Sequence, residues 1–238
     1  MTLTNELTRQ LYGLADSHIT YIDQTTKPII GDKSDSKALG IHNQMLVDYQ
    51  SLISSAKKAS IEIKIASGFR SFERQLMIWN NKFTGKAPIK NIDGESIDIS
   101  KLSEYNIIEA ILLFSALPGA SRHHWGCDID IYSPNLLDGK ILQLEPWEYA
   151  LSGPMGKLSS WLTDNASKFG FFFPYDKFRG GISAEPWHLS YAPIAQQYQS
   201  SFNLDSLKEL LLNTDIAGKD AIIENLQDIF RRFISNVN

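Results

Sequence analysis

The sequence is poor in cysteine and has no excess of positive charge. Cys127 is the single cysteine among 238 residues, so an internal disulfide framework and a cysteine-rich zinc site are both excluded. Lysine and arginine number 23 against 27 aspartate and glutamate residues, which gives a net charge of −4. Because proteins that bind nucleic acids usually concentrate basic residues, we expect no nucleic-acid partner.

Long apolar runs are also missing. The nearest one, residues 107–117, is interrupted by Glu109 and Ser115, so we expect no membrane span. Polar residues are scattered through residues 1–21, where a secretory signal would need a continuous apolar segment. We therefore expect a cytoplasmic protein. The alternative is a periplasmic protein whose signal has been removed.

The spacing of the apolar residues predicts a mixture of helices and short strands. Helices are expected at residues 43–58, 71–83, 105–117 and 157–169. Strands are expected at residues 61–65, 127–132 and 187–191. Ser71 is of a type that caps helix N-termini, and Gly170 is of the type that ends them.

The ends of the chain differ from its middle, and three regions are expected, at residues 1–42, 43–200 and 201–238. The first is an extension with a loop at Gly31–Lys37. In the last, Ser206 and Glu209 form a capping-box pattern, and Gly218 precedes a longer amphipathic helix. We expect two helices here that form a hairpin and pack on the central domain; a homodimer interface is the alternative.

Side chains of metal-binding type lie in two short stretches. Ser121–Asp130 holds two histidines and two aspartates, and Glu185–His188 adds a third imidazole and a further carboxylate. Three nitrogen or oxygen ligands with one open position are typical of catalytic zinc, and a spare carboxylate can act as base. Alternation along the strand after Cys127 places Asp128 and Asp130 on one face, which we expect to border a cleft.

A third stretch, Ser67–Gln75, lies upstream. Arg70 precedes the expected cap Ser71, and Gln75 is the fourth helical residue; these two positions approach each other at a helix start. A helix N-terminus favours anions, and an arginine there can hold a carboxylate or a developing oxyanion. The alternative for Arg70 is a surface ion pair with Glu73.

Together, the three stretches resemble the zinc D-alanyl-D-alanine carboxypeptidase family, over roughly residues 60–195. The family pattern runs SGxRS…Q, then SxHxxGxxxD, then ExWH. The matching residues are Ser67, Gly68, Arg70, Ser71 and Gln75, then Ser121, His123, Gly126 and Asp130, then Glu185, Trp187 and His188. The resemblance, with the expected elements, implies an α+β fold: a small, mainly antiparallel sheet flanked by helices, with zinc in a surface cleft.

The resemblance also implies roles for individual residues. The zinc ligands would be His123, Asp130 and His188. Glu185 would be the general base and Arg70 the second catalytic residue. The residues implied in substrate binding are Arg70, Gln75, Ser121 and Trp187.

Two neighbouring residues leave alternatives open. His124 rivals His123 as a ligand, but the spacing of the pattern selects His123, so His124 is expected to be a packing or rim residue. Asp128 stands where the family usually has a small residue. It would either orient a ligand histidine or be a solvated charge at the edge. The thiol of Cys127 is expected to face the core and be inert.

The expected activity is removal of C-terminal D-alanine from murein peptides. We expect an L,D-carboxypeptidase that acts on tetrapeptides in murein recycling. The alternatives are a D,D-carboxypeptidase on pentapeptides, a murein endopeptidase of lysin type, and a metal-binding module without catalysis.

Overall fold

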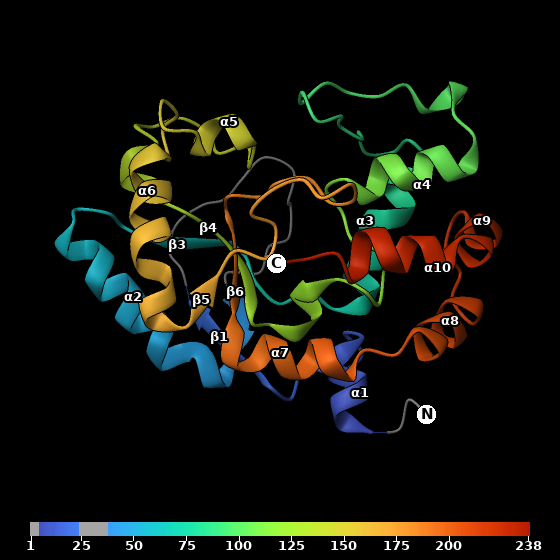
Figure 1. The fold of residues 1–238 in the computed structure, drawn as a ribbon, viewed down its shortest axis with the longest axis horizontal. Helices are drawn as coiled ribbons and strands as arrows, with labels where there is room; N and C mark the ends of the chain where they lie inside the picture. The colour runs from blue at the N-terminus through green and yellow to red at the C-terminus, as the bar shows by residue number, and fades with distance from the viewer. Residues whose placement is uncertain (1–4, 24–37) are drawn as a thin grey trace.

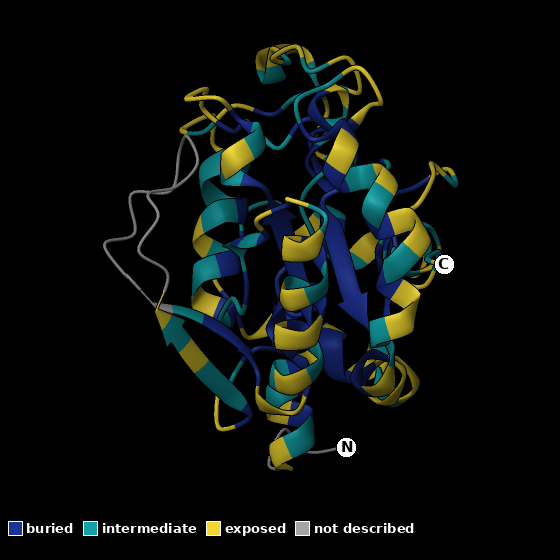
Figure 2. Cartoon of the chain, turned by 90° about the vertical axis from the view of Figure 1, so that its left-hand side faces the viewer, coloured by how far each residue is buried: buried dark blue, intermediate teal, exposed yellow. Residues whose placement is uncertain are grey.

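A four-stranded antiparallel sheet lies at the centre of the computed structural model, which describes residues 5–23 and 38–238. Its strands lie in the order β3-β4-β6-β5. Their bounds are β3 Lys64–Ser67, β4 Asp128–Tyr132, β5 Phe171–Phe172 and β6 His188–Tyr191. Helices surround this sheet (Figure 1), and Figure 2 shows buried strands behind helices whose outer faces are exposed. The expected α+β fold with a small antiparallel sheet is confirmed.

The helices are α1 Glu6–Leu11, α2 Leu46–Lys58, α3 Phe72–Phe83, α4 Glu104–Leu112, α5 Pro146–Tyr149, α6 Gly156–Asn165, α7 Ala192–Ser201, α8 Leu204–Leu212, α9 Lys219–Glu224 and α10 Leu226–Ile229. Ser71 caps α3 as expected, because its hydroxyl accepts a hydrogen bond from the Arg74 amide at 3.2 Å. Gly170, with φ of 79°, ends the 3-10 turn that continues α6. Within residues 5–23 and 38–238, no helix is both long and apolar enough to cross a membrane.

Two elements are shorter than the sequence predicts. The alternation of Ile61, Ile63 and Ile65 does direct all three side chains into the core. However, β3 begins only at Lys64, where β4 lies opposite. Helix α4 ends at Leu112 instead of continuing to residue 117. The chain leaves the helix there because its carbonyl groups bind elsewhere: that of Leu113, for instance, accepts from the Ser183 amide at 2.9 Å.

The N-terminal residues pack against the central domain. Strands β1 Ile19–Asp23 and β2 Ala38–His42 form an antiparallel pair. The carbonyl of Leu11 accepts from the Trp125 indole at 3.2 Å. The carbonyl of Gly40 accepts from the Phe69 amide at 2.7 Å. The expected loop Gly31–Lys37 lies outside the described residues, and the limits of the three expected regions stay a prediction.

The C-terminal region corrects one expectation. Asn203 and not Ser206 caps α8: its side chain accepts from the Ser206 amide at 2.9 Å, and Ser206 itself is buried in the first turn. Both asparagine and serine are good caps, so the pattern alone did not separate them.

The single long helix expected after Gly218 is also wrong. The helical segment is interrupted at Asn225, which ends α9 and precedes α10, and a π-helical turn follows at Phe230–Ile234. This region packs on the rest of the domain, because the Trp79 indole donates to the Ala217 carbonyl at 3.0 Å. The homodimer stays an untested alternative.

Candidate metal centre and active site

The pairing of two strands brings the first two candidate ligands together. In the antiparallel pair β4–β6, Asp130 lies opposite His188 and Asp128 lies opposite Ser190. Because side chains alternate along a strand, these four polar residues share one face of the sheet. The Nδ1 atom of His188 is 3.0 Å from Oδ1 of Asp130.

His123 approaches from the 3-10 turn Arg122–Trp125, which comes directly before β4. Gly126 ends this turn with a φ of 67°, a conformation that glycine adopts without strain. The chain can therefore turn back and place the His123 ring 4.9 Å from the His188 ring, centre to centre. The Nε2 atom of His123 is 3.4 Å from Oδ2 of Asp130. One ligand atom from each of His123, Asp130 and His188 lies within 4.8 Å of the others.

The hydrogen bonds of the two histidines prepare them to bind a cation. Nδ1 of His123 lies 3.0 Å from the Gly68 carbonyl, and Nε2 of His188 lies 2.9 Å from the Asp128 carboxylate. A carbonyl and a carboxylate only accept hydrogen bonds, so these nitrogens carry the protons. When each ring is neutral, the lone pair of its opposite nitrogen therefore faces Asp130.

The unsatisfied atoms of the site fit a metal. Oδ1 of Asp130 and Nδ1 of His188 are buried and make no hydrogen bond within the described structure. Buried polar atoms without partners are costly, and a bound cation would satisfy both. Two imidazoles and one carboxylate are a donor set that suits zinc.

Charge in the site also favours a cation. Burial opposes the ionisation of Asp130, yet His123 and His188 hold its pKa well below its usual range. Burial lowers the pKa of His188, but the neighbouring carboxylates of Asp128, Asp130 and Glu185 raise it well above its usual value. Without metal, three carboxylates thus hold a proton on the ring; a metal ion at the same place would replace that proton.

The position of Asp128 decides between its two expected roles, which were to orient a ligand histidine or to be a solvated charge at the edge. It is fully buried, so the solvated edge charge is wrong. Its carboxylate accepts from His188, from Nε of Arg122 at 2.6 Å and from the Ser190 hydroxyl at 2.7 Å. Burial alone would raise the pKa of Asp128, but Arg122 and His188 lower it to about 2. It does not line the cavity described below, so only Asp130 of the two aspartates borders it.

His124 is a packing residue and not a rim residue. It is fully buried, and its Nδ1 lies 2.6 Å from the Arg70 carbonyl while its Nε2 accepts from the Gly119 amide at 3.1 Å. Burial lowers its pKa to about 3, so it is neutral at physiological pH. Both ring nitrogens are occupied, which leaves none for a metal. Cys127 is buried on the core side, and burial raises the pKa of its thiol, as an inert cysteine requires.

Glu185 lies beside the three candidate ligands. The His188 amide donates to the Glu185 carbonyl at 3.0 Å, a turn that comes directly before β6 and includes Pro186. This turn brings Oε2 of Glu185 to 3.4 Å from Nδ1 of His188. The carboxylate is buried, and burial raises its pKa. A carboxylate at this place could serve as base toward a water molecule activated by a metal.

Arg70 and Gln75 meet at the start of α3, as their positions predicted. The Arg70 guanidinium donates to the Gln75 side chain at 2.9 Å and to the Ser67 hydroxyl at 2.9 Å. Gln75 is fully buried, and its amide nitrogen donates to the Ala116 carbonyl at 2.6 Å. Arg70 lines the cavity and Gln75 does not. The contacts therefore favour Gln75 as the residue that orients Arg70, in place of the direct substrate contact implied by the resemblance.

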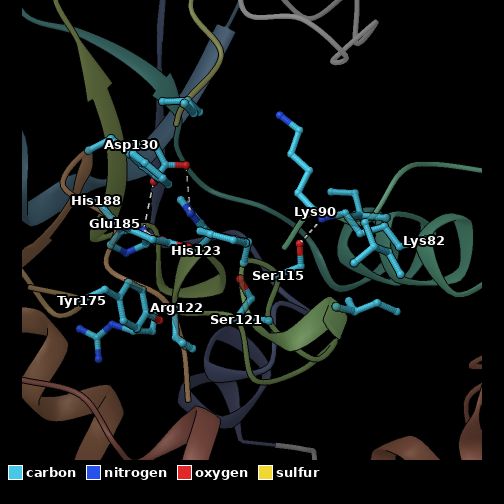
Figure 3. A pocket seen from close by; sticks show the side chains of 18 of the residues that line it. Lys82, Lys90, Ser115, Ser121, Arg122, His123, Asp130, Tyr175, Glu185 and His188 are labelled. Carbon is cyan, nitrogen blue, oxygen red and sulfur yellow. Dashed lines mark hydrogen bonds and ion pairs between the residues drawn. The ribbon is translucent and has the colours of Figure 1, made fainter. Parts of the chain in front are cut away.

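A cavity of about 590 Å³ contains these groups. Ser121 and Trp187 line it, and the Trp187 ring packs 5.7 Å from the ring of Tyr149, centre to centre. Figure 3 shows the candidate ligands on one side of the cavity and Lys82, Lys90 and Ser115 on the other.

Sequence reasoning missed several residues of the cavity. They are Lys82, Lys90, Ser115, Glu145 and Tyr175. The Tyr175 ring stands edge-on to His188 with its centre 4.8 Å away, and Lys90 pairs with Glu145. None of them lies in the three motifs, so no local signal could have found them.

Three residues that could hold a metal ion, with a further carboxylate beside them in one cavity, form an arrangement used by metal-dependent hydrolases. The family model described as "VanY: D-alanyl-D-alanine carboxypeptidase" matches residues 38–194. The chain belongs to this family. Its members are zinc carboxypeptidases, so the expected enzyme class and zinc are confirmed at the level of the family.

The chain is also similar to individual proteins. A protein of Haemophilus influenzae, described as uncharacterised, is 39% identical over 121 residues, which are 50% of this chain and 92% of that protein. A D-alanyl-D-alanine carboxypeptidase of Enterococcus faecalis is 28% identical over 148 residues, which are 61% of this chain and 46% of that protein. The match thus spans less than half of the enterococcal protein.

Among solved structures, the LdcB LD-carboxypeptidase has a TM-score of 0.50 and 22% sequence identity. The alignment covers 91% of this chain and 78% of that one. At this identity the likeness shows the fold alone.

Proposed function

We propose that this protein is a zinc carboxypeptidase that removes the C-terminal D-alanine from murein peptides, with a preference for the L,D bond of tetrapeptides. The observation that carries the proposal is the convergence of His123, Asp130 and His188 with Glu185 and Arg70 in one cavity. Zinc held by the first three would polarise the scissile carbonyl and lower the pKa of a water molecule.

The chain's own groups account for the remaining steps. Glu185, beside His188, takes the proton from the attacking water and passes it to the leaving amine. Arg70, held in place by Gln75 and Ser67, binds the terminal carboxylate or the oxyanion that develops on the carbonyl. Trp187 and Tyr175 form part of the cavity wall and limit the access of other water.

The size and charge of the cavity support the L,D preference. In a pentapeptide the residue before the scissile bond is D-alanine, with a methyl side chain. In a tetrapeptide it is an L-configured diamino acid with a long polar side chain. A cavity of about 590 Å³ has room for such a side chain. Its far wall, with Lys82 and the Lys90–Glu145 ion pair, offers charged partners for the polar end.

A place in murein recycling follows from the same preference, because removal of D-alanine from tetrapeptides would return tripeptide for reuse. The cytoplasmic location expected from the sequence stays a prediction.

The test is a competition between tetrapeptide and pentapeptide muropeptides at equal concentration, with the products identified by mass. Faster loss of D-alanine from the tetrapeptide is the expected result. Faster loss from the pentapeptide would favour a D,D-carboxypeptidase, in line with the description of the family model. Cleavage within the stem would favour an endopeptidase.

A further inference from the structure

Lys82 is a cation in the cavity without an acidic partner. It lies in the last turn of α3, is partly buried, and lines the cavity. Its ammonium donates to the Ser115 hydroxyl at 2.6 Å. Among residues 5–23 and 38–238, no carboxylate forms an ion pair with it. A hydroxyl is neutral, so the charge of Lys82 is left uncompensated.

Other cations of the cavity are placed differently. Lys90 pairs with Glu145, and Arg122 pairs with Asp128. Arg70 donates to Gln75 and Ser67 beside the candidate metal centre. Lys82 is therefore the cavity cation whose contacts suit an anion that comes from outside the chain.

The surroundings of Lys82 destabilise the charged form of its side chain. Burial, and then the nearby charge of Arg70, lower the pKa of Lys82 to about 8. A lysine at this position is less favourable for folding than an apolar residue of similar length. Uncompensated charges that border a cleft are commonly found where a ligand completes them.

An ammonium has three donors, and Ser115 uses one of them. Figure 3 shows Lys82 and Ser115 on the wall of the cavity opposite His123 and Asp130. A peptide whose scissile carbonyl lies at the triad would extend other groups toward this wall. Murein tetrapeptides can carry two carboxylates near that bond: the C-terminal one, and one on the side chain of the third residue where that residue is diaminopimelate.

We propose that Lys82, steadied by Ser115, binds a carboxylate of the murein substrate and is a specificity-determining residue of this cavity. The proposal rests on the proposed function for the identity of the peptide. The anion-binding role itself rests on the contacts of Lys82.

The test adds Lys82→Met to the Glu185→Gln protein and compares the double variant with Glu185→Gln alone, in which turnover is slowed by about 10²- to 10⁴-fold. Binding is measured by calorimetry on the zinc-loaded protein. The ligands all have D-isoglutamine at the second position, so that no carboxylate remains there. They are the tetrapeptide with diaminopimelate, the same peptide with L-lysine at the third position, and the L-lysine peptide ending in D-alaninamide. The last of these has neither carboxylate.

Loss of a charge-assisted hydrogen bond corresponds to about 10- to 100-fold weaker binding. If Lys82 binds the side-chain carboxylate, Lys82→Met weakens binding of the diaminopimelate peptide by this factor and leaves the L-lysine peptide unchanged. If it binds the C-terminal carboxylate, both acids bind more weakly and the amide does not. Equal binding of all three peptides by both proteins would overturn the proposal. So would an equal loss for all three, which would indicate a structural role.

Three further variants keep the test decisive. Lys82→Arg retains the positive charge and should recover most of the binding. Ser115→Ala leaves the lysine in place and should cause a smaller loss on the same peptide; it also serves if Lys82→Met does not fold. Lys86→Met changes an exposed lysine of the following loop and should bind all peptides as the parent does.

The two proposals fail in different ways. If the protein with Glu185 intact releases no D-alanine from any peptide, the proposed function is wrong. If it releases D-alanine but Lys82→Met binds every peptide normally, only the role of Lys82 is wrong.

Discussion

On the sheet side of the cavity, the candidate ligands come from β4, β6 and the turn before β4, and a second group holds each histidine. The Gly68 carbonyl keeps a proton on Nδ1 of His123, and the Asp128 carboxylate keeps a proton on Nε2 of His188. On the opposite side, Lys82 has a single hydroxyl as partner, and Lys90 and Glu145 reach over from separate loops. The contacts on the sheet side orient the two histidines toward the place where a metal ion would bind. On the opposite wall Lys90 and Glu145 pair with each other, and Lys82 is the charge for which we propose a partner in the peptide.

The sheet side should be most sensitive to loss of a ligand. His188→Ala removes the imidazole that faces Asp130, and we expect near-complete loss of zinc together with all measurable peptidase activity. Elemental analysis and activity assays check this. His124→Ala is the matched control, since both of its ring nitrogens bond to the backbone; it should retain zinc. Full zinc occupancy in His188→Ala would show that the ligand set is wrong.

Loss of the Glu185 carboxylate should lower the turnover rate and leave zinc binding unchanged. Glu185→Gln keeps the shape of the side chain but cannot accept a proton, so we expect kcat to fall by about 10²- to 10⁴-fold. Zinc content should equal that of the unaltered protein, because Glu185 is not one of the three ligands. Turnover at the original rate would contradict the assignment of Glu185 as the base.

The second group on His188 should have a smaller effect. Asp128→Asn keeps the size of the side chain but removes the negative charge that faces His188 and Arg122. Removal of such supporting groups typically weakens metal binding by about 10- to 100-fold. A competition titration with a zinc chelator measures this. Ser190→Ala removes one hydrogen bond to Asp128 and leaves its charge, so it should weaken binding far less. If Asp128→Asn bound zinc as tightly as the unaltered protein does, His188 would need no orienting partner.

On the opposite wall, the smallest expected effect concerns stability in the alkaline range. The pKa of Lys82 is about 8 in the folded protein, against about 10.4 in an unfolded chain. Between these values the unfolded chain binds more protons, so the contribution of Lys82 to the free energy of unfolding rises with pH.

Lys82→Met should remove this contribution and flatten the pH dependence above about pH 8. Denaturant midpoints of the two proteins, measured from about pH 7.5 to 10, give the comparison. Lys86→Met should behave as the unaltered protein does, because Lys86 is exposed. Identical slopes for Lys82→Met and the unaltered protein would mean that Lys82 is well solvated.

Sequence patterns predicted the helices and strands well where residues close in the sequence decide the structure. The cap at Ser71, the stop at Gly170 and the alternation of Ile61, Ile63 and Ile65 are all present. Errors arose where distant contacts compete. Helix α4 ends early because the following carbonyls bind elsewhere, and Asn203 takes the cap expected of Ser206.

The sequence by itself determined the family, and it predicted the residue types of the candidate metal site and the choice of His123 over His124. These depend on the spacing within short motifs, and spacing along a strand or turn decides which side chains share a face. The pairing of Asp128 with Arg122 and His188, and the isolated charge of Lys82 beside Ser115, were decided by the tertiary structure alone. Asp128 reaches His188, and Arg122 reaches Ser190, only when β4 pairs with β6. Lys82 meets Ser115 only when α3 packs beside the chain that follows α4.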